Sequence, residues 1–469
     1  MVRAYGKDLM YVEELGNWYQ WTGISWRQAT DATIIALCKD VVRGLSSEAM
    51  ASIDDKERSE VLSFAVKSQK ASMVKNMEFL IRSDGKVRVR AYELDKHVHL
   101  LGTLNGAIDL RTGTLVAPDR EARITTTCLA SYTPSAKCPL FEETVLGVFG
   151  GEREMAAFFK RLMGYTLLGN PKEDALVIPF GSGSNGKSTV LGIIRKVLGG
   201  YARTADASTF LDDGHGRGNN AGGPREDVLR LRGARFVYIG EPSENSELKE
   251  NLVKSMTGGD PMPARGVHGK TTIEVTPTWV PIMPTNHRPI IKGDDYAIWR
   301  RIMTVPFLQT FKQKEGGTAD LGRAEKLEAE LDGILTWLVQ GALEYQAKGL
   351  CVPYAVETAK EEYKADMDLL GDWLENCTEH HRGGLATVDE LWSSWQAYAT
   401  ARGELRFIPS ARSLGKRLAN RKQFEPFNTT FKGFGRHRGY RDLVVKGQMP
   451  MLADFFTEEA KQATMTLSF

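Results

Sequence analysis

The chain has 469 residues, of which 42% are hydrophobic and 26% are charged, so it is long enough for two or three globular domains. No apolar run approaches the roughly 20 residues of a membrane-spanning helix, which argues against a membrane protein. The five cysteines form no CxxC pair, as is typical of a reducing compartment, and we expect a cytoplasmic protein. Within 402–446, twelve Lys and Arg residues stand against three acidic residues, which favours a polyanion as partner of this region.

The first 140 residues are predicted to form a mixed α/β accessory domain. Aromatic and polar residues alternate in NWYQWTGISW (17–26), which predicts a hairpin, and residues 30–50 have the spacing of an amphipathic helix. Residues 100–119 predict two short strands that are joined by a turn at Arg111, Thr112 and Gly113.

Strands and helices alternate from 141 to 350, which predicts an α/β domain with a parallel sheet. Residues 141–170 have an amphipathic helical pattern, and the apolar run ALVIPF (175–180) then leads through a glycine-rich loop into another helix. Further helices are expected at 246–257 and, as one helix or a pair, at 325–346. The other strand candidates are RFVYIGE (235–241), TTIEVTP (271–277) and WVPIMPTN (279–286).

The glycine-rich segment GSGSNGKST (181–189) fits the pattern G-x-x-x-x-G-K-[ST] of phosphate-binding loops. Glycines let successive backbone N–H groups point at phosphate oxygens, and the N-terminus of the following helix adds its positive end. We therefore predict an ATP site, in which Lys187 contacts the β- and γ-phosphates and the Ser188 hydroxyl binds Mg²⁺. The expected nucleotide-binding residues are Gly181, Ser182, Gly183, Ser184, Asn185, Gly186, Lys187, Ser188 and Thr189.

Three later positions favour a motor over a small-molecule kinase. Glu241 ends a strand candidate, where a carboxylate can polarise the attacking water and lie near Mg²⁺. Asn286 ends the strand candidate after it, and its amide can hold both the γ-phosphate and that water. Arg300 and Arg301 precede another strand, and an arginine supplied by a neighbouring subunit would stabilise charge on the γ-phosphate. Taken singly, each of these residues is also common at an ordinary turn or surface.

The C-terminal region, 371–446, is predicted to contain two helices followed by a basic hairpin. A basic helix beside a basic hairpin is typical of a duplex-binding module, and a docking domain for a replication protein is the alternative. Trp392, Trp395 and Tyr398 are expected to be core residues, because their spacing marks one face of a helix. The basic residues are Arg412, Lys416, Arg417 and Arg421 in the helix, and Lys432, Arg436, Arg438 and Arg441 in the hairpin.

Taken in order, five motifs resemble those of the superfamily 3 helicases, most closely the phage/plasmid primase family and the poxvirus primase–helicase. They are GSGSNGKST, RFVYIGE, MTGGDPMPARGVHGK, TNHRP and IWRRIMTVPF. NGAIDLRTG (105–113) and FKRLMGYTLLGN (159–170) resemble the segments that precede the motor in that family, and the basic C-terminal module resembles its winged-helix ending. The resemblance therefore covers most of the chain.

This resemblance implies an α/β fold: an AAA+-like P-loop motor (141–350) between an accessory domain (1–140) and a winged-helix-like domain (365–446), with a tail at 447–469. It gives Lys187 and Ser188 the Walker A role, Glu241 the Walker B role and Asn286 the sensor 1 role. Arg301 matches the arginine finger, with Arg300 as the alternative. A hairpin at 259–275 would hold the DNA backbone; Gly269 suits its tip, and the alternating TTIEV suits its returning strand. Its expected contact residues are Arg265, His268 and Lys270.

We therefore expect an ATP-dependent DNA helicase of phage or mobile-element replication, located in the cytoplasm of a bacterial host. It would move along single-stranded DNA as a ring, as a hexamer, in the 3′→5′ direction that the resemblance suggests. Its expected partners are single-stranded and forked DNA, further copies of itself and a separate primase; the tail segment QMPML also loosely resembles a sliding-clamp peptide. An origin-binding initiator that uses ATP as an assembly switch is the alternative function.

Overall fold

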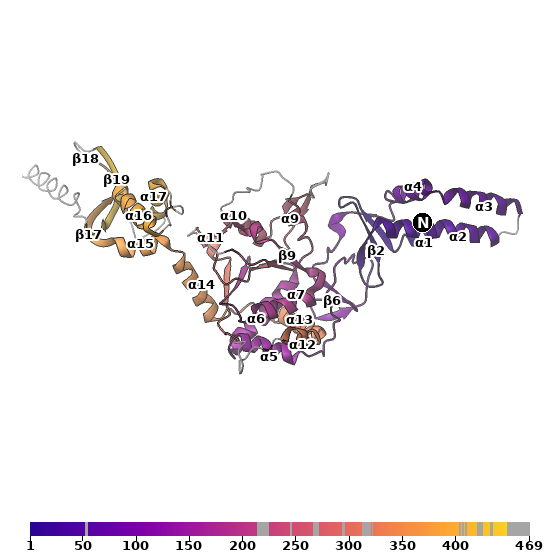
Figure 1. Cartoon of the computed structure of the whole chain (residues 1–469), viewed down its shortest axis with the longest axis horizontal. Helices are drawn as coiled ribbons and strands as arrows, with labels where there is room; N and C mark the ends of the chain where they lie inside the picture. The colour runs from indigo at the N-terminus through magenta and orange to yellow at the C-terminus, as the bar shows by residue number, and fades with distance from the viewer. Residues whose placement is uncertain are drawn as a thin grey trace, which may run out of the picture. The chain divides into compact units, whose positions relative to one another are not determined.

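The computed structural model of the protein divides into two compact units, Met1–Glu361 and Glu362–Phe469 (Figure 1). None of the helices in the described part of the chain combines the length and the apolarity that a bilayer span requires. The structure describes residues 1–51, 55–212, 225–243, 246–265, 272–292, 296–311, 320, 322–402, 405, 408, 410–419, 425–431 and 435–447.

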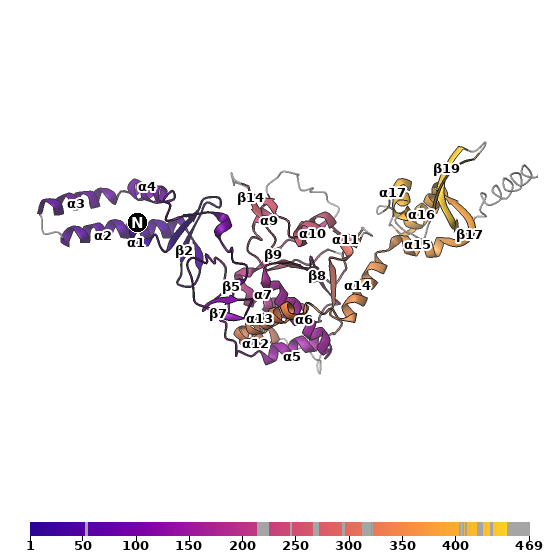
Figure 2. The same ribbon diagram turned by 180° about the vertical axis from the view of Figure 1, so that it is seen from behind.

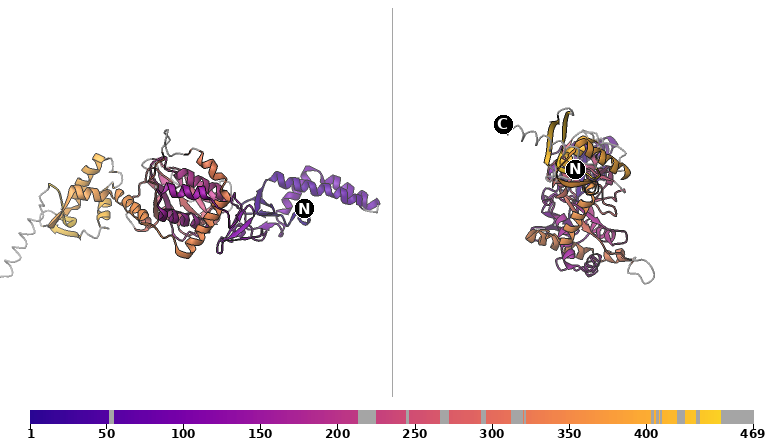
Figure 3. Two further views of the ribbon diagram at one scale, coloured as in Figure 1. Left: turned by 90° about the horizontal axis from the view of Figure 1, so that it is seen from below. Right: turned by 90° about the vertical axis from the view of Figure 1, so that its left-hand side faces the viewer.

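The N-terminal part of the first unit combines a small sheet with a bundle of helices. Its strands β1 (Leu9–Val12), β2 (Asn17–Trp21), β3 (Trp26–Ala29) and β4 (Arg88–Val89) lie in the order β3-β2-β1-β4. Strands β2 and β3 pair antiparallel, which confirms the hairpin predicted at 17–26. The helices α2 (Asp31–Ala51), α3 (Asp55–Ser68) and α4 (Ala71–Ile81) follow. Figures 1 and 2 show α2 running beside α3 and α4, and Figure 3 shows the same part of the chain from two further sides. The buried Trp18 ties the two parts together, because its Nε1 donates to Glu78 Oε1 on α4 at 2.7 Å.

Residues 100–116 form three strands, so the prediction of two strands in this segment was wrong. Strands β5 (Leu100–Thr103), β6 (Gly106–Asp109) and β7 (Thr114–Val116) form an antiparallel sheet. The missed turn is a two-residue connection at Leu104 and Asn105, between the paired residues Thr103 and Gly106. Gly106 has φ +149°, and a Cβ there would lie 2.5 Å from Val116 O, so only glycine fits.

The centre of the first unit is a five-stranded parallel sheet within the described residues, as the alternation of strands and helices predicted. Its strand order is β16-β8-β15-β11-β9. Because all its strands run parallel, their carboxyl ends meet at one edge of the sheet. The strands are β8 (Leu176–Phe180), β9 (Ala202–Ala205), β11 (Phe236–Ile239), β15 (Val280–Ile282) and β16 (Ile302–Pro306).

One set of helices covers a face of this sheet, and shorter helices lie on the other side (Figures 1 and 2). The covering helices and the sheet share one core, which includes the fully buried Phe158, Phe159 and Phe307. The covering helices are α5 (Pro139–Val148), α6 (Arg153–Tyr165), α7 (Lys187–Leu198), α12 (Arg323–Glu328) and α13 (Leu331–Lys348). The shorter helices are α9 (Glu226–Leu229), α10 (Glu250–Thr257) and α11 (Tyr296–Trp299).

Two helix predictions need refinement. The helix expected at 246–257 begins only at Glu250, because the preceding residues are extended: β12 (Glu247–Leu248) pairs with β10 (Leu211–Asp212). The segment at 325–346 is a helix pair, α12 and α13, and their boundary falls at 329–330. The remaining elements of this unit are α1 (Val2–Tyr5), α8 (Ala207–Phe210), the 3₁₀ turns Ala91–Glu93, Thr166–Leu168 and Gly199–Tyr201, and the paired strands β13 (Met262–Ala264) and β14 (Ile273–Val275).

The second unit packs helices against a three-stranded sheet of order β17-β19-β18 (Figure 2). The hairpin of β18 (Glu425–Phe431) and β19 (Gly435–Val445) was expected, whereas β17 (Thr378–Thr387) was not. Trp395 is fully buried and its ring meets Trp373 edge-on, with Trp392 and Tyr398 packed against the same core, as predicted. The helices are α14 (Tyr354–Asp366), which crosses the boundary between the units, α15 (Leu369–Cys377), α16 (Val388–Arg402) and α17 (Ala411–Ala419).

Candidate functional site

The glycine-rich loop connects the end of β8 to the start of α7, at the carboxyl edge of the parallel sheet. Gly186 has φ +80° and directly precedes α7, and a Cβ there would lie 2.5 Å from Val148 Cγ1. The loop is held from outside by the segment after β16: Asn185 Nδ2 donates to Phe307 O at 3.1 Å, and Phe311 N donates to Ser184 O at 2.8 Å. The loop is thus a fixed turn that leads into the positive end of a helix.

Lys187 and Glu241 are both hydrogen-bonded to Asn286 at this edge. Lys187 Nζ donates to Gly181 O at 2.5 Å and to Asn286 Oδ1 at 3.0 Å. Asn286 Nδ2 in turn donates to Glu241 Oε1 at 2.8 Å. Burial lowers the pKa of Lys187, whereas the negative charge of Glu241 raises it. The amide of Asn286 therefore links a cation to an anion.

The order of the strands explains why these three residues meet. Lys187 follows β8, Asn286 follows β15 and Glu241 follows β11, and these strands are neighbours in the order β8-β15-β11. Asn286 comes from the middle strand, so its side chain lies between the other two. The sequence placed each residue at a strand end, and the parallel sheet brings the ends together.

The oxygen atoms near Lys187 suit a hard divalent cation bound together with phosphate. Ser188 is exposed at the first turn of α7, and Glu241 is exposed at the end of β11. Mg²⁺ prefers oxygen ligands and keeps several water molecules, with one or two protein ligands. No cluster of three or more His, Cys, Asp or Glu residues occurs in the described residues. Ser188 and Glu241 are the side chains that could hold such a metal, together with phosphate oxygens and water.

Arg300 and Arg301 lie at the opposite edge of the sheet, before β16. The Arg301 side chain is 11% exposed, and it donates to Thr257 Oγ1 at 3.2 Å and to Ala297 O at 2.7 Å. The Arg300 side chain is 43% exposed, and its Nη2 lies 3.0 Å from Asp174 Oδ2. The five residues of β8 separate this edge from the glycine-rich loop by roughly 16 Å. Neither arginine is therefore near the Lys187 of its own chain.

The expected DNA-binding hairpin at 259–275 is described only in part. Strands β13 and β14 pair antiparallel, from Met262 opposite Val275 to Ala264 opposite Ile273. Arg265 follows β13 and is half-buried, whereas His268 and Lys270 lie outside the described residues. The pairing is that of the two arms of a hairpin.

Part of the basic C-terminal surface is described. Arg412 is exposed on α17, and Arg438 is exposed on β19, opposite Asn428 of β18. Lys416 belongs to α17 and Arg436 to β19. Tyr440 connects the two elements, because its hydroxyl donates to Gly415 O at 2.7 Å. Lys432, Arg421 and the clamp-like segment of the tail, Gln448–Leu452, lie outside the described residues.

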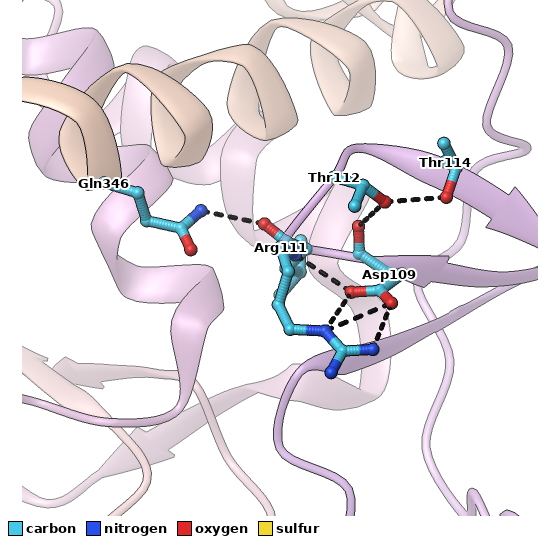
Figure 4. Close-up of polar contacts among 6 residues, drawn as sticks. Asp109, Arg111, Thr112, Thr114 and Gln346 are labelled. Atoms are coloured by element: carbon cyan, nitrogen blue, oxygen red, sulfur yellow. Dashed lines mark hydrogen bonds and ion pairs between the residues drawn. The ribbon is translucent and has the colours of Figure 1, made fainter.

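The motif NGAIDLRTG forms a polar turn between β6 and β7 (Figure 4). Asp109 accepts from the Arg111 backbone at 3.0 Å and from the Arg111 guanidinium at 2.6–3.2 Å. These hydrogen bonds lower the pKa of Asp109 to about 2. Gln346 Nε2 on α13 donates to Leu110 O at 2.8 Å, which ties the turn to the core helices. This motif therefore has a structural role in the described residues.

The sequence analysis did not predict the contacts that Asp174 and Asn185 make. Asp174, which contacts both arginines, precedes β8 with φ +51°, and no sequence pattern marks it. Asn185 fell within the predicted loop, but its bond to Phe307 O depends on a strand more than a hundred residues away. Both contacts follow from tertiary packing.

Comparison with known proteins shows which proteins this chain resembles. A family model described as "D5 N terminal like" matches residues 1–150. A protein of Acanthamoeba polyphaga mimivirus named "Putative helicase" is 26% identical over 324 residues, which is 63% of this chain and 32% of the relative. A "Putative helicase" of Frog virus 3 is 27% identical over 259 residues (52% and 26%), and a "Putative primase" of African swine fever virus is 24% identical over 242 residues (50% and 24%).

The chain spans between 24% and 32% of the length of these three relatives. Among solved structures, the apo C-terminal region of NrS-1 matches with a TM-score of 0.50 and 11% identity, over 92% of this chain and 95% of that one. At this identity the match indicates a shared fold. The match over residues 1–150 and these relatives support a relationship between this chain and viral proteins named as putative helicases and primases.

Proposed function

We propose that this chain is the motor part of an ATP-dependent DNA helicase of phage or mobile-element replication. The contact of Lys187, Asn286 and Glu241 at the ends of three adjacent strands carries the proposal. Transfer of a phosphoryl group to water needs a cation for the phosphates, a group that orients the water and a carboxylate near it. These three side chains supply all three functions within one contact network.

In this proposal the loop 181–189 is a P-loop of an AAA+-like domain. Its backbone N–H groups and the N-terminus of α7 would hold the phosphates, and Lys187 would contact the β- and γ-phosphates. Mg²⁺, held by Ser188 with help from Glu241, would neutralise charge on the phosphate oxygens. Glu241 and Asn286 would orient the attacking water.

The position of the arginines supports a site shared between two subunits. Arg300 and Arg301 lie a strand's length from the loop of their own chain, so either of them could reach ATP only in another copy. A ring of identical subunits offers such a head-to-tail interface at every site. Arg300 suits this role better than Arg301, because Arg301 is nearly buried and bonded within its own chain. We therefore propose Arg300 as the finger and a ring, such as a hexamer, as the assembly.

DNA would be bound by two basic regions. The hairpin of β13 and β14, with Arg265, His268 and Lys270, would contact single-stranded DNA in the ring, and its movement would drive 3′→5′ translocation. Arg412, Lys416, Lys432, Arg436 and Arg438 would make the second unit a winged-helix module that binds the fork. A separate primase and a sliding clamp are the proposed protein partners, in the cytoplasm of the host.

Replacement of Lys187 tests the ATP site. Lys187→Ala should lower DNA-stimulated ATP turnover at least about 100-fold, because a preorganised charge at the phosphates is lost. DNA binding by the second unit should persist, and strand displacement on a forked duplex should stop. Lys196→Ala is the matched control: this lysine is on the same helix but contacts Glu328, and its removal should leave turnover unchanged. DNA binding without DNA-stimulated turnover in the unaltered chain would favour an initiator that uses ATP as a switch.

Mixing two inactive variants tests the shared site. Arg300→Ala subunits keep Lys187, and Lys187→Ala subunits keep Arg300, so equal mixing should restore about a quarter of the interfaces. The recovered ATP turnover should approach that fraction of the unaltered rate. Arg301→Ala should instead lower the melting temperature, because its bond to Thr257 is lost. A strictly monomeric chain that hydrolyses ATP at full rate with DNA present would contradict the proposal.

A further inference from the structure

A large cavity opens between the N-terminal sheet and the outer strand of the central sheet. Its volume is about 1220 Å³, which exceeds the usual range of about 300–1,000 Å³ for small-molecule pockets. The N-terminal sheet contributes Asn17, Tyr19 and Gln28 to its wall. Strand β9 contributes Arg203 and Thr204, and Arg265 lines it beside β13. The cavity is therefore built from parts of the chain that are distant in sequence.

The acidic residues of this wall already have partners. Glu13 Oε2 lies 3.6 Å from the guanidinium groups of Arg88 and Arg90. Glu14 lies 3.1 Å from the Arg90 guanidinium and also accepts from Ala91 N, and Glu226 is 2.5 Å from Arg230. Asp95 accepts from Thr125 N at 2.7 Å and from the Thr125 hydroxyl. Burial raises the pKa of Asp95, which disfavours its negative charge. These acids therefore contribute little free negative charge to the cavity.

Two of the arginines of the wall have no partner among the described residues. Arg203 is exposed on β9, and Arg265 is half-buried at the end of β13; no hydrogen bond or ion pair joins either of them to a described residue. Arg232, by contrast, donates to Ala91 O at 2.5 Å. Two uncompensated guanidinium groups beside one cavity attract phosphate oxygens.

The rest of the wall favours a nucleic-acid backbone over bases. Threonine and amide side chains, such as Thr126, Thr204 and Gln28, can donate to phosphate and sugar oxygens. Tyr19 is 8% exposed, so its ring offers little surface on which a base could stack. Recognition here would depend on charge and on the backbone, without preference for sequence.

We infer that this cavity binds the backbone of a single nucleic-acid strand, with Arg203 and Arg265 on separate phosphates. The inference rests on the proposed helicase function and adds a second contact surface to it, in which the N-terminal sheet forms the opposite wall. A strand that leaves the β13–β14 hairpin at Arg265 would continue along the outer strand β9 at Arg203.

A salt series with the full chain tests the inference. Fluorescence anisotropy would measure binding of labelled dT20, and of rU20 in a parallel arm, to the unaltered chain and to Arg203→Ala, Arg265→Ala and the double variant. Each phosphate contact contributes a slope of about −0.7 to log K against log salt. Each single variant should therefore bind about fivefold more weakly at 0.1 M salt, and the double variant about 25-fold. Equal losses with dT20 and rU20 would indicate a site for either strand, and a loss with dT20 alone a site for DNA.

Two controls separate charge from folding. Arg27 is exposed on β3, next to Gln28 but on the opposite face of the strand, so Arg27→Ala should leave both binding and basal ATP turnover unchanged. Arg203→Lys keeps the charge and should keep most of the slope. An unchanged salt slope in the double variant, with strong binding retained, would overturn the inference and leave the helicase proposal intact. Failure of the unaltered chain to bind either oligonucleotide would overturn both.

Discussion

Two helices that cover one face of the central sheet are in close contact. This contact predicts that a glycine-to-alanine replacement, which usually stabilises a helix, destabilises the protein here. Helices α6 and α13 cross at two glycines, with backbone against backbone. A Cβ on Gly341 would lie 2.2 Å from Lys160 O, and a Cβ on Gly164 would lie 2.2 Å from Ala342 N. Backbone atoms cannot rotate away as a side chain can, so Gly341→Ala must push the helices apart.

The magnitude follows from two opposed effects. Replacing a helical glycine by alanine normally stabilises a protein by about 0.4–1 kcal/mol, because the unfolded chain loses conformational freedom. Overpacking a tight contact costs about 1–3 kcal/mol. Gly341→Ala should therefore lower the free energy of unfolding by up to about 2.6 kcal/mol. Gly192→Ala is the matched control: this glycine is inside α7 and exposed, and no atom lies within 4 Å of its Cβ position.

Urea denaturation followed by far-ultraviolet circular dichroism would measure both variants. Midpoints are the appropriate quantity, because the two units need not unfold together. Gly192→Ala should raise the midpoint of the first unit and Gly341→Ala should lower it. The shift should correspond to a difference of about 1–3 kcal/mol in the free energy of unfolding between the two variants. If Gly341→Ala raised the midpoint as Gly192→Ala does, the tight helix contact would be refuted.

Two further predictions concern the accessory part of the chain. Trp18→Phe should lower the free energy of unfolding by about 1–3 kcal/mol, because the buried Glu78 loses a donor. Trp21→Phe, whose indole makes no hydrogen bond to a described residue, should cost less, and urea denaturation of both variants would measure the difference. Asp109→Asn should destabilise at neutral pH, because Arg111 holds the pKa of Asp109 at about 2. A carboxyl group whose pKa is lowered by folding stabilises the folded state above its unfolded pKa of about 3.9, and this stabilisation is lost as the pH falls toward the folded pKa. The urea midpoints of the variant and the unaltered chain should therefore differ by a constant amount from pH 7 to 5 and converge below about pH 4.

The sequence predicted the candidate site best where a charged or amide side chain directly follows an apolar strand. Lys187, Glu241 and Asn286 each follow an apolar run, and a parallel sheet necessarily gathers such positions at one edge. The turn at Leu104 and Asn105 was missed, although the dipeptide Asn105–Gly106 is of a type that commonly marks a turn. The close approach of Gly106 to Val116 O across the sheet, by contrast, leaves no mark in local periodicity.

The burial and contacts of Arg300, Arg301 and Arg203 could likewise not be predicted from the sequence. Arg300 and Arg301 are adjacent and chemically alike, and only the hydroxyl of Thr257 and the turn at Ala297 distinguish the buried one. The cavity beside Arg203 is similar, since its walls come from segments that are more than 150 residues apart. Contacts of this kind depend on the assembled fold and not on the order of residues.

In the proposed ATP site, the two hydrogen bonds of Lys187 would couple substrate binding to hydrolysis. A phosphate that accepts from Lys187 Nζ competes with Gly181 O and Asn286 Oδ1 for the same three protons. When Asn286 gives up the lysine, its carbonyl oxygen becomes free while its amide stays on Glu241. Binding of the phosphate would thereby free the carbonyl oxygen of Asn286 beside Glu241. The two groups that orient the attacking water would then both be available only after the nucleotide has bound.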